Sequence, residues 1–195
     1  MVKNIIFDIG GVILYFNRDF LLSKYYSGRE TELLKEKLFK DWELLDEDAI
    51  SIEEYNKNVL SSLPERLHAP AKTVLNYWEY AMSYKKGIVD LVRFLKEKGY
   101  NLYILSNMTY HFIERDYKFP LLKEFDGIVY SAEIKLIKPN PEIFKYILNK
   151  FDLVGEECLF IDDLKPNLES AQRFGIKTYQ FLDDTEDLKN YILTL

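Results

Sequence analysis

Several features are scarce in this sequence of 195 residues, and each absence narrows the possible functions. One cysteine, Cys158, is present, so the chain cannot form an internal disulfide, and its apolar neighbours predict a buried thiol without a chemical role. The 26 lysine and arginine residues are outnumbered by 32 acidic residues, which gives a net charge of −6, and no run of basic residues occurs. The composition therefore argues against binding to nucleic acid or to an anionic membrane surface.

Long apolar runs are missing as well. The most apolar segments, such as residues 4–9 and 101–105, are far too short to span a bilayer, and the chain opens directly into a strand pattern rather than a signal peptide. We therefore expect a soluble, cytoplasmic protein with no membrane partner. The patterns Gly-x-Gly-x-x-Gly and Gly-Lys-Ser/Thr do not occur, so no nucleotide cofactor is indicated, and no pattern indicates an oligomeric state.

The sequence does contain short runs rich in β-branched and aromatic residues, which predict buried strands. The five runs are residues 4–9, 100–105, 127–130, 158–161 and 176–181. From residue 87 onward, helical patterns alternate with them, at residues 87–98, 141–150 and 166–174. Such alternation predicts an α/β fold with a mostly parallel sheet and helices on both faces, which is a three-layer, Rossmann-like core of five strands.

Residues 17–86 interrupt this alternation. The segment has helical patterns, two tryptophans and many tyrosines but no convincing strand, and it is too long for an ordinary crossover. Ser51 and Glu54 have the spacing of a helix capping box. We therefore predict an inserted domain of four helices at residues 17–86, and a core domain formed by residues 1–16 and 87–195.

Polar residues follow directly after several of the predicted strands. Ligands of open parallel sheets bind beyond the carboxyl ends of the strands, so we expect these residues to form a site. They are Asp8 after the first strand, Ser106 and Asn107 after the second, Lys138 in the loop after the third, and Asp162 and Asp163 after the fourth. Carboxylates next to apolar strands are poorly solvated, so they predict a nearby cation.

These residues belong to four motifs that resemble, in the same order, those of the haloacid dehalogenase superfamily. The motifs are Asp8-Ile9-Gly10-Gly11-Val12, Leu105-Ser106-Asn107, Ile137-Lys138-Pro139-Asn140-Pro141, and Phe160-Ile161-Asp162-Asp163 followed by Asn167 and Ala171. They span nearly the whole chain and are most similar to those of sugar-phosphate phosphatases. The resemblance implies a phosphatase that acts on a small phosphorylated metabolite, and a mobile helical cap at residues 17–86.

The same resemblance implies that Asp8 is a nucleophile that attacks phosphorus and forms an aspartyl-phosphate. It also implies a Mg²⁺ cofactor held by Asp8, the main-chain carbonyl of Gly10, and Asp163, because Mg²⁺ prefers hard oxygen ligands. The family places its metal-binding aspartate four residues before an asparagine or aspartate, and Asn167 has that spacing from Asp163. Asp162 and Asn167 would then support the site.

In this family the phosphoryl group is bound by residues that match Ser106, Asn107 and Lys138, and the lysine also pairs with the nucleophile. The chain departs from the family's usual pattern at Gly10. At this position the family usually has a second aspartate, which protonates the leaving group. Gly10 keeps the main-chain carbonyl but lacks an acid, and such acid–base catalysis is often worth ~10²–10⁴ in rate. We therefore expect a preference for phosphates with a more acidic leaving oxygen, such as anomeric sugar phosphates.

Two other functions stay open at this point. A metal-independent 2-haloacid dehalogenase would use the same nucleophile, although an uncharged substrate gives no use to the acidic pair Asp162 and Asp163. A weakly active or regulatory protein is suggested by Gly10 alone, and the retained charged residues argue against it. His111 follows the second motif closely and is a minor candidate for a substrate contact. The aromatic residues Trp42, Tyr55 and Trp78 are predicted to form the interior of the insertion.

Overall fold

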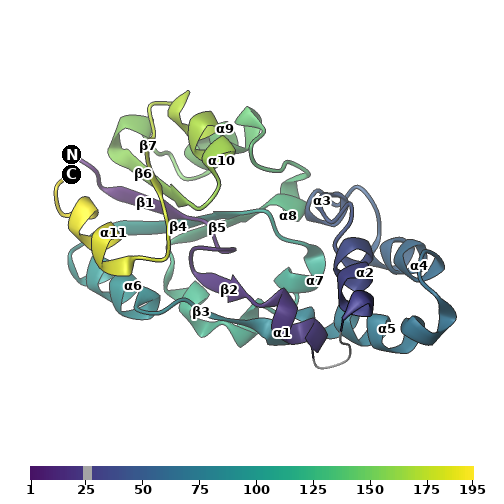
Figure 1. The fold of residues 1–195 in the computed structure, drawn as a ribbon. Coiled ribbons are helices and arrows are strands. Elements are labelled where there is room, and N and C mark those ends of the chain that lie inside the picture. The colour runs from purple at the N-terminus through teal and green to yellow at the C-terminus, as the bar shows by residue number, and fades with distance from the viewer. Residues whose placement is uncertain (24–27) are drawn as a thin grey trace.

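A sheet of five parallel strands forms the centre of the protein (Figure 1). The computed structural model describes residues 1–23 and 28–195. The strands of this sheet, in chain order, are β1 (Asn4–Phe7), β4 (Asn101–Ser106), β5 (Gly127–Tyr130), β6 (Cys158–Asp162) and β7 (Lys177–Gln180). Their spatial order is β5-β4-β1-β6-β7. β1 therefore lies between the two strands that carry the second and fourth motifs.

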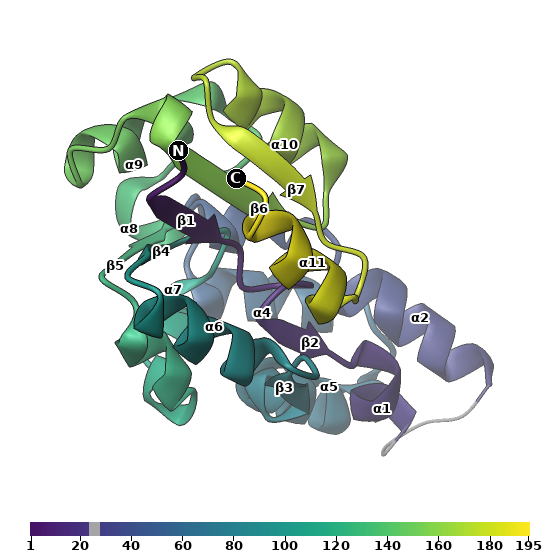
Figure 2. The ribbon, with the colours of Figure 1, turned by 90° about the vertical axis from the view of Figure 1, so that its left-hand side faces the viewer.

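Helices cover both faces of the sheet, as Figure 2 shows. One face carries α6 (Ile88–Glu97) and α11 (Thr185–Ile192), and the other carries α9 (Pro141–Lys150) and α10 (Lys165–Gln172). Two short helices, α7 (Tyr110–Ile113) and α8 (Ser131–Ile134), follow β4 and β5. The three-layer arrangement predicted from the alternation of strands and helices is therefore confirmed.

Successive residues of β1 enter opposite faces of the sheet. Ile5 and Phe7 belong to the apolar cluster that includes residues of α6 and α11, whereas Ile6 belongs to the cluster with α9 and α10. All three side chains are fully buried. Because neither face of the sheet meets water, the strand has a continuous apolar sequence rather than an alternating one.

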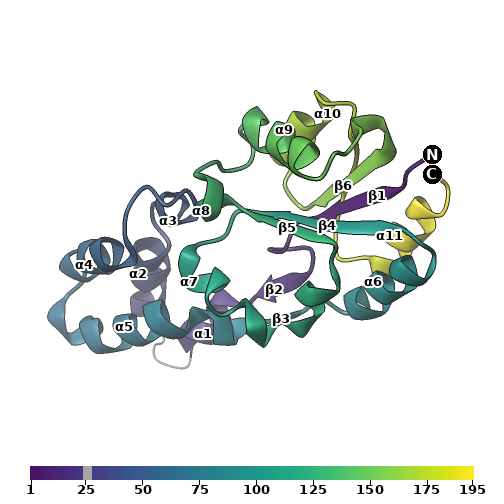
Figure 3. The same cartoon turned by 180° about the vertical axis from the view of Figure 1, so that it is seen from behind.

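Between β1 and α6 the chain leaves the sheet and forms a helical unit beside its carboxyl edge (Figures 1 and 3). Its α-helices are α1 (Arg18–Ser23), α2 (Arg29–Leu38), α3 (Glu43–Asp46), α4 (Ile52–Ser61) and α5 (His68–Tyr77). The hydroxyl of Ser51 accepts a hydrogen bond of 3.1 Å from the N–H of Glu54, which confirms half of the predicted capping box. The helical character predicted for this segment agrees with the structure, although its described residues form five α-helices rather than the predicted four. The division of this segment from the core at residues 17 and 86 stays a prediction.

A pair of short strands at the base of this unit was not expected from the sequence. β2 (Leu14–Phe16) pairs antiparallel with β3 (Met82–Tyr84), and Tyr15 lies opposite Ser83. The prediction of no strand within residues 17–86 was therefore wrong at β3. Three residues are too few to show a period of two, and the partner strand lies at the other end of the insertion.

The remaining element boundaries lie close to the predicted ones. α9 spans the predicted residues 141–150, and α6 lies within the predicted residues 87–98. Short 3₁₀ helices that had not been predicted cover Glu65–Leu67, Trp78–Ala81, Asp116–Lys118, Pro120–Glu124 and Gly155–Glu157. Among the helices of residues 1–23 and 28–195, none has both the length and the apolar composition needed to cross a membrane.

Candidate active site

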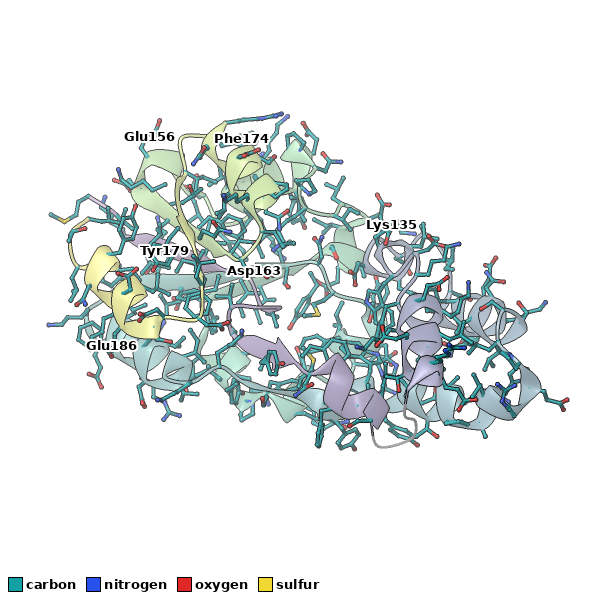
Figure 4. The ribbon with its side chains drawn as sticks, in the orientation of Figure 1. Lys135, Glu156, Asp163, Phe174, Tyr179 and Glu186 are labelled. Atoms are coloured by element: carbon teal, nitrogen blue, oxygen red, sulfur yellow. The ribbon has the colours of Figure 1, made fainter. Side chains whose placement is uncertain are left out.

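The parallel strands bring the residues of the four motifs to one edge of the sheet. Asp8 follows β1 directly, Ser106 is the last residue of β4, and Asp162 is the last residue of β6. Because β1 lies between β4 and β6, side chains at these strand ends can meet although they are far apart in sequence. Lys138 reaches the same place from the loop after α8. Asp163, labelled in Figure 4, lies at this carboxyl edge.

The carboxylate of Asp8 is buried and receives two donors on the same oxygen. The hydroxyl of Ser106 donates to Oδ1 over 2.7 Å, and Lys138 Nζ lies 2.8 Å from the same atom. Burial raises the pKa of Asp8 to about 6, an effect that the Lys138 charge opposes and the Asp162 charge reinforces. Both contacts hold the carboxylate in one orientation, so its second oxygen, Oδ2, is the atom that can act on a ligand.

Lys138 holds a buried ammonium group between two carboxylates. Its Nζ lies 2.7 Å from Asp162 Oδ2 and 2.8 Å from Asp8 Oδ1, and the side chain is 1% exposed. Burial lowers the pKa of Lys138, but the charges of Asp8 and Asp162 outweigh this effect, so the pKa is raised above its usual value. The ammonium is therefore charged at neutral pH.

The Asn107 side chain fixes the backbone of Lys138. Its Nδ2 donates to the Lys138 carbonyl over 3.0 Å, and its Oδ1 accepts the Lys138 N–H over 2.8 Å. This reciprocal pair of hydrogen bonds ties the loop after α8 to the end of β4. Because the side-chain amide is engaged in this way, the expectation that Asn107 binds a phosphoryl group now rests on its main-chain N–H.

The two neighbouring aspartates have different surroundings. Asp162 is fully buried, and its oxygens accept hydrogen bonds of 3.0 Å from Asn167 Nδ2 and 2.8 Å from the Leu164 N–H, in addition to the Lys138 contact. Asp163 is half-buried, and its carboxylate rests against Gly11, where an added Cβ would lie 2.5 Å from Oδ2. Asp162 is thus saturated with donors, whereas Asp163 lines a cavity.

A divalent cation fits the charge of this cluster. Ligand oxygens of Asp8, Asp162 and Asp163 all lie within 4.8 Å of one another. Burial and the Asp162 charge raise the pKa of Asp163, as expected where three carboxylates share one buried ammonium. An oxygen-rich site with excess negative charge suits Mg²⁺. Because Asp162 already accepts several hydrogen bonds, Asp8 and Asp163 are the carboxylates best placed to hold the ion.

A cavity of about 540 Å³ opens beside these residues and is closed on its other side by the helical unit. The helical unit contributes Trp42, Asp46 and Trp78 to the cavity lining, and Lys85 lies where the chain returns to the core. The sequence did not place Asp46 or Lys85 in the site, because neither belongs to one of the four motifs. A larger cavity of about 680 Å³ lies between the helical unit and α7, and its lining includes none of the residues proposed for catalysis.

The other residues considered from the sequence have structural contacts. His111 Nε2 lies 3.2 Å from Glu79 Oε2, and its ring stacks on Trp78 with the centroids 5.7 Å apart. His111 does not line the cavity beside Asp8. Trp42 packs against both Trp78 and Tyr55, so the predicted aromatic interior is present. Trp42 and Trp78 belong to that interior and to the cavity wall together.

A parallel sheet that gathers an aspartate, a serine, a lysine and an acidic pair at one edge, beneath a helical insertion after the first strand, has the arrangement of a hydrolase with an aspartate nucleophile. The family model for haloacid dehalogenase-like hydrolases matches residues 2–175, and the chain belongs to this family. The resemblance inferred from the four motifs is therefore confirmed, and with it the prediction that the protein is a hydrolase.

The chain is similar to characterised members of this family. The D-ribitol-5-phosphate phosphatase of Bacteroides thetaiotaomicron is 28% identical over 193 residues, which cover 92% of each chain. A haloacid dehalogenase-family enzyme from the same organism, solved in complex with magnesium and inorganic phosphate, aligns with a TM-score of 0.76 at 25% identity, covering 96% of this chain and 99% of that one. Rat bifunctional epoxide hydrolase 2 is 28% identical over 186 residues, 88% of this chain, and the match spans 32% of that protein.

Proposed function

We propose that this protein is a magnesium-dependent phosphatase that hydrolyses a small phosphorylated metabolite, with sugar and sugar-alcohol phosphates as the substrate class. The observation that carries the proposal is the buried Asp8 carboxylate, oriented by Ser106 Oγ at 2.7 Å and Lys138 Nζ at 2.8 Å. A nucleophile flanked by two donors suits an anionic phosphoryl group. The relative named for D-ribitol 5-phosphate supports the substrate class.

In the proposed reaction Asp8 attacks phosphorus, and the bond between phosphorus and the leaving oxygen breaks. The resulting aspartyl-phosphate is attacked by water, which restores the carboxylate and releases inorganic phosphate. Covalent catalysis divides one difficult displacement into two easier ones. Ser106 and Lys138 already contact the nucleophile, so a phosphoryl group beside Asp8 comes within reach of both donors.

The proposed Mg²⁺ ligands are Asp8, the main-chain carbonyl of Gly10, and Asp163. When bound, the ion supplies positive charge that offsets the negative charge of the phosphoryl oxygens. Asp162 has a positioning role in this proposal, because it holds the Lys138 ammonium at 2.7 Å and is itself held by Asn167.

The cavity supports a small polar substrate. A volume of about 540 Å³ lies within the usual range for sites of small molecules. The partly exposed ring of Trp42 can pack on the C–H surface of a sugar, and Lys85 adds a second cation to the same lining. We therefore propose that the helical unit acts as a cap that contributes to substrate selection.

The direct test is release of inorganic phosphate from a panel of sugar, sugar-alcohol, nucleotide and acyl phosphates, with Mg²⁺ and with a chelator. We expect release from the sugar or sugar-alcohol phosphates, and loss of that release in the chelator. Halide release from a 2-haloacid in the chelator, without any phosphate release, would favour the dehalogenase alternative instead.

The metal ligands can be tested by comparing Asp163→Ala with Asp162→Ala. We expect Asp163→Ala to lower the apparent Mg²⁺ affinity by more than about 10-fold with little loss of stability, because Asp163 is half-buried and lines the cavity. Asp162→Ala should lower the Mg²⁺ affinity less and the free energy of unfolding more, by about 3 kcal/mol, because it breaks a buried ion pair. Mg²⁺ titration calorimetry and urea unfolding measure the two effects, and the opposite ranking would assign the ligand to Asp162.

A further inference from the structure

The glycine at position 10 leaves the proposed reaction without a proton donor for the leaving oxygen. An alkoxide is a poor leaving group, and a positioned acid commonly contributes ~10²–10⁴ in rate. The space beside Gly10 is open, since an added Cβ would meet no atom within 4 Å. The place where the side chain of the missing acid would begin is therefore empty, and a replacement acid has to come from another part of the cavity lining.

The helical unit contributes one carboxyl group to this lining, that of Asp46, the last residue of α3. The backbone of Asp46 is anchored to the core, because its carbonyl accepts a hydrogen bond from the Ser131 hydroxyl at the start of α8. Two residues further along, Asp48 Oδ2 lies 3.2 Å from Lys135 Nζ at the end of α8. Figure 4 shows Lys135 where α8 and α3 meet. Two contacts thus hold the end of α3 against the sheet domain.

The surroundings of Asp46 favour its protonated form. Burial raises the pKa of Asp46 to about 7, and the negative charges of Asp8 and Glu43 raise it as well. The Lys138 charge and a hydrogen bond from the Trp42 side chain act in the opposite direction. A carboxyl with this pKa is partly protonated at neutral pH and can both give and accept a proton there. The groups that perturb it include the proposed nucleophile and the proposed phosphate-binding lysine.

We propose that Asp46 is the general acid of this enzyme, supplied by the cap in place of the acid that Gly10 lacks. When Asp8 bonds to phosphorus, the bond from phosphorus to the leaving oxygen breaks, and the Asp46 proton transfers to that oxygen to give the free alcohol. The Asp46 carboxylate then takes a proton from the water that attacks the aspartyl-phosphate. Phosphate leaves, the Asp8 carboxylate is restored, and Asp46 is protonated again.

The assignment rests on the proposed phosphatase function and changes the expected substrate range. Without any acid, the enzyme would favour phosphates of acidic hydroxyls. With Asp46 in place, ordinary primary alcohols of sugar and sugar-alcohol phosphates also become suitable leaving groups. The cap then completes the catalytic site as well as closing it, because the proton donor arrives on α3.

The test compares Asp46→Asn with the parent on two substrates, a sugar-alcohol 5-phosphate and p-nitrophenyl phosphate. The nitrophenolate leaves without a proton, so we expect kcat to fall by about 10²-fold or more on the sugar-alcohol phosphate and by less than about 5-fold on the aryl phosphate. The double variant Gly10→Asp/Asp46→Asn should have a kcat on the sugar-alcohol phosphate at least 10-fold above that of Asp46→Asn, since the space at Gly10 is open. Asp41→Asn, which removes an exposed carboxylate just before α3, is the matched control and should match the parent.

Each possible result either supports or rejects Asp46 as the general acid. Equal losses on both substrates in a folded Asp46→Asn protein would overturn the acid role while leaving the phosphatase function standing. An unchanged kcat on the sugar-alcohol phosphate would overturn it as well. If the parent releases phosphate from neither substrate nor any other in the panel, the proposed function fails, and the assignment of Asp46 fails with it.

Discussion

Asp8→Asn is expected to reduce phosphate release by at least about 10⁴-fold, because an amide cannot attack phosphorus and the proposed reaction has no second nucleophile. Phosphate release by the purified, folded variant on the full substrate panel measures this loss. The conservative comparison is Asp126→Asn, which removes a carboxylate far from the cluster, at the other end of β4. Turnover of Asp8→Asn near the parent level would remove Asp8 from the mechanism.

The same substitution should not weaken the fold at neutral pH in the absence of Mg²⁺. The pKa of Asp8 is raised from 3.8 to about 6, so its charged form is disfavoured in the folded protein. A raised carboxyl pKa means that stability present below about pH 4 is lost as the pH rises through about 6. The parent should therefore lose about 2–3 kcal/mol of unfolding free energy from pH 4 to pH 8 that Asp8→Asn does not lose. Relative to the parent, the variant should be more stable at pH 8 than at pH 4 by that amount. Urea unfolding at both pH values tests the sign, and a relative decrease would contradict it.

Lys138→Met should cause the largest combined loss of activity and stability. Methionine has a similar length but no charge, so Asp8 and Asp162 lose the ammonium that lies 2.8 and 2.7 Å from them. Leaving buried carboxylates unpaired typically costs about 3–5 kcal/mol, and loss of a charge-stabilising donor lowers kcat by about 10²–10³-fold. Urea unfolding and phosphate release measure the two effects. Lys145→Met, which removes an exposed lysine of α9, should change both very little.

The stability loss of Lys138→Met should depend on pH and on Mg²⁺. Without the ammonium the pKa of Asp8 rises further, so protonation near pH 5 can neutralise the carboxylate and reduce the loss relative to pH 8. Added Mg²⁺ should also stabilise the variant more than it stabilises the parent, because the ion replaces part of the missing positive charge. A loss of the same size at pH 5 and pH 8 would show that packing, rather than charge, dominates.

Much of the core fold could be predicted from local patterns. A strand that is buried on both faces must be apolar along its length, so β1 and β6 are visible as continuous runs in the sequence. The helix α9 is visible from the Asn140-Pro141 start, and the Asn140 side chain does accept a hydrogen bond from the N–H of Glu142. These signals are short-range, because each depends on one element and its immediate environment.

The pairing of β2 with β3 could not be predicted in the same way. Each strand has three residues and is only partly buried, so neither contains enough apolar positions to reveal a period. The pair forms because both ends of the insertion return to the same place, which depends on how the whole helical unit packs. The helix α11 was missed for a related reason, since three of its eight residues are charged and only Leu188 and Ile192 are buried.

The candidate site shows the same division between local and long-range information. Asp8, Ser106 and Lys138 could be named from the sequence, because they follow apolar strands whose carboxyl ends must meet in a parallel sheet. The distinct environments of Asp162 and Asp163 needed the structure, since both stand in the same motif. Asp46 needed it too, because only the packing of α3 on α8 brings that residue to the cavity.

By itself, the sequence determined the order of the five core strands, their parallel arrangement and the residues at the carboxyl edge of the sheet, because burial and chain direction act on neighbouring residues. The tertiary structure decided which carboxylate is saturated by donors, which one faces the cavity, and which carboxylate of the helical unit lines the same cavity as Gly10. Those outcomes depend on contacts between segments that are distant in sequence. Their energies are set by burial and by the separation of charges in space, and neither quantity is encoded in a local pattern.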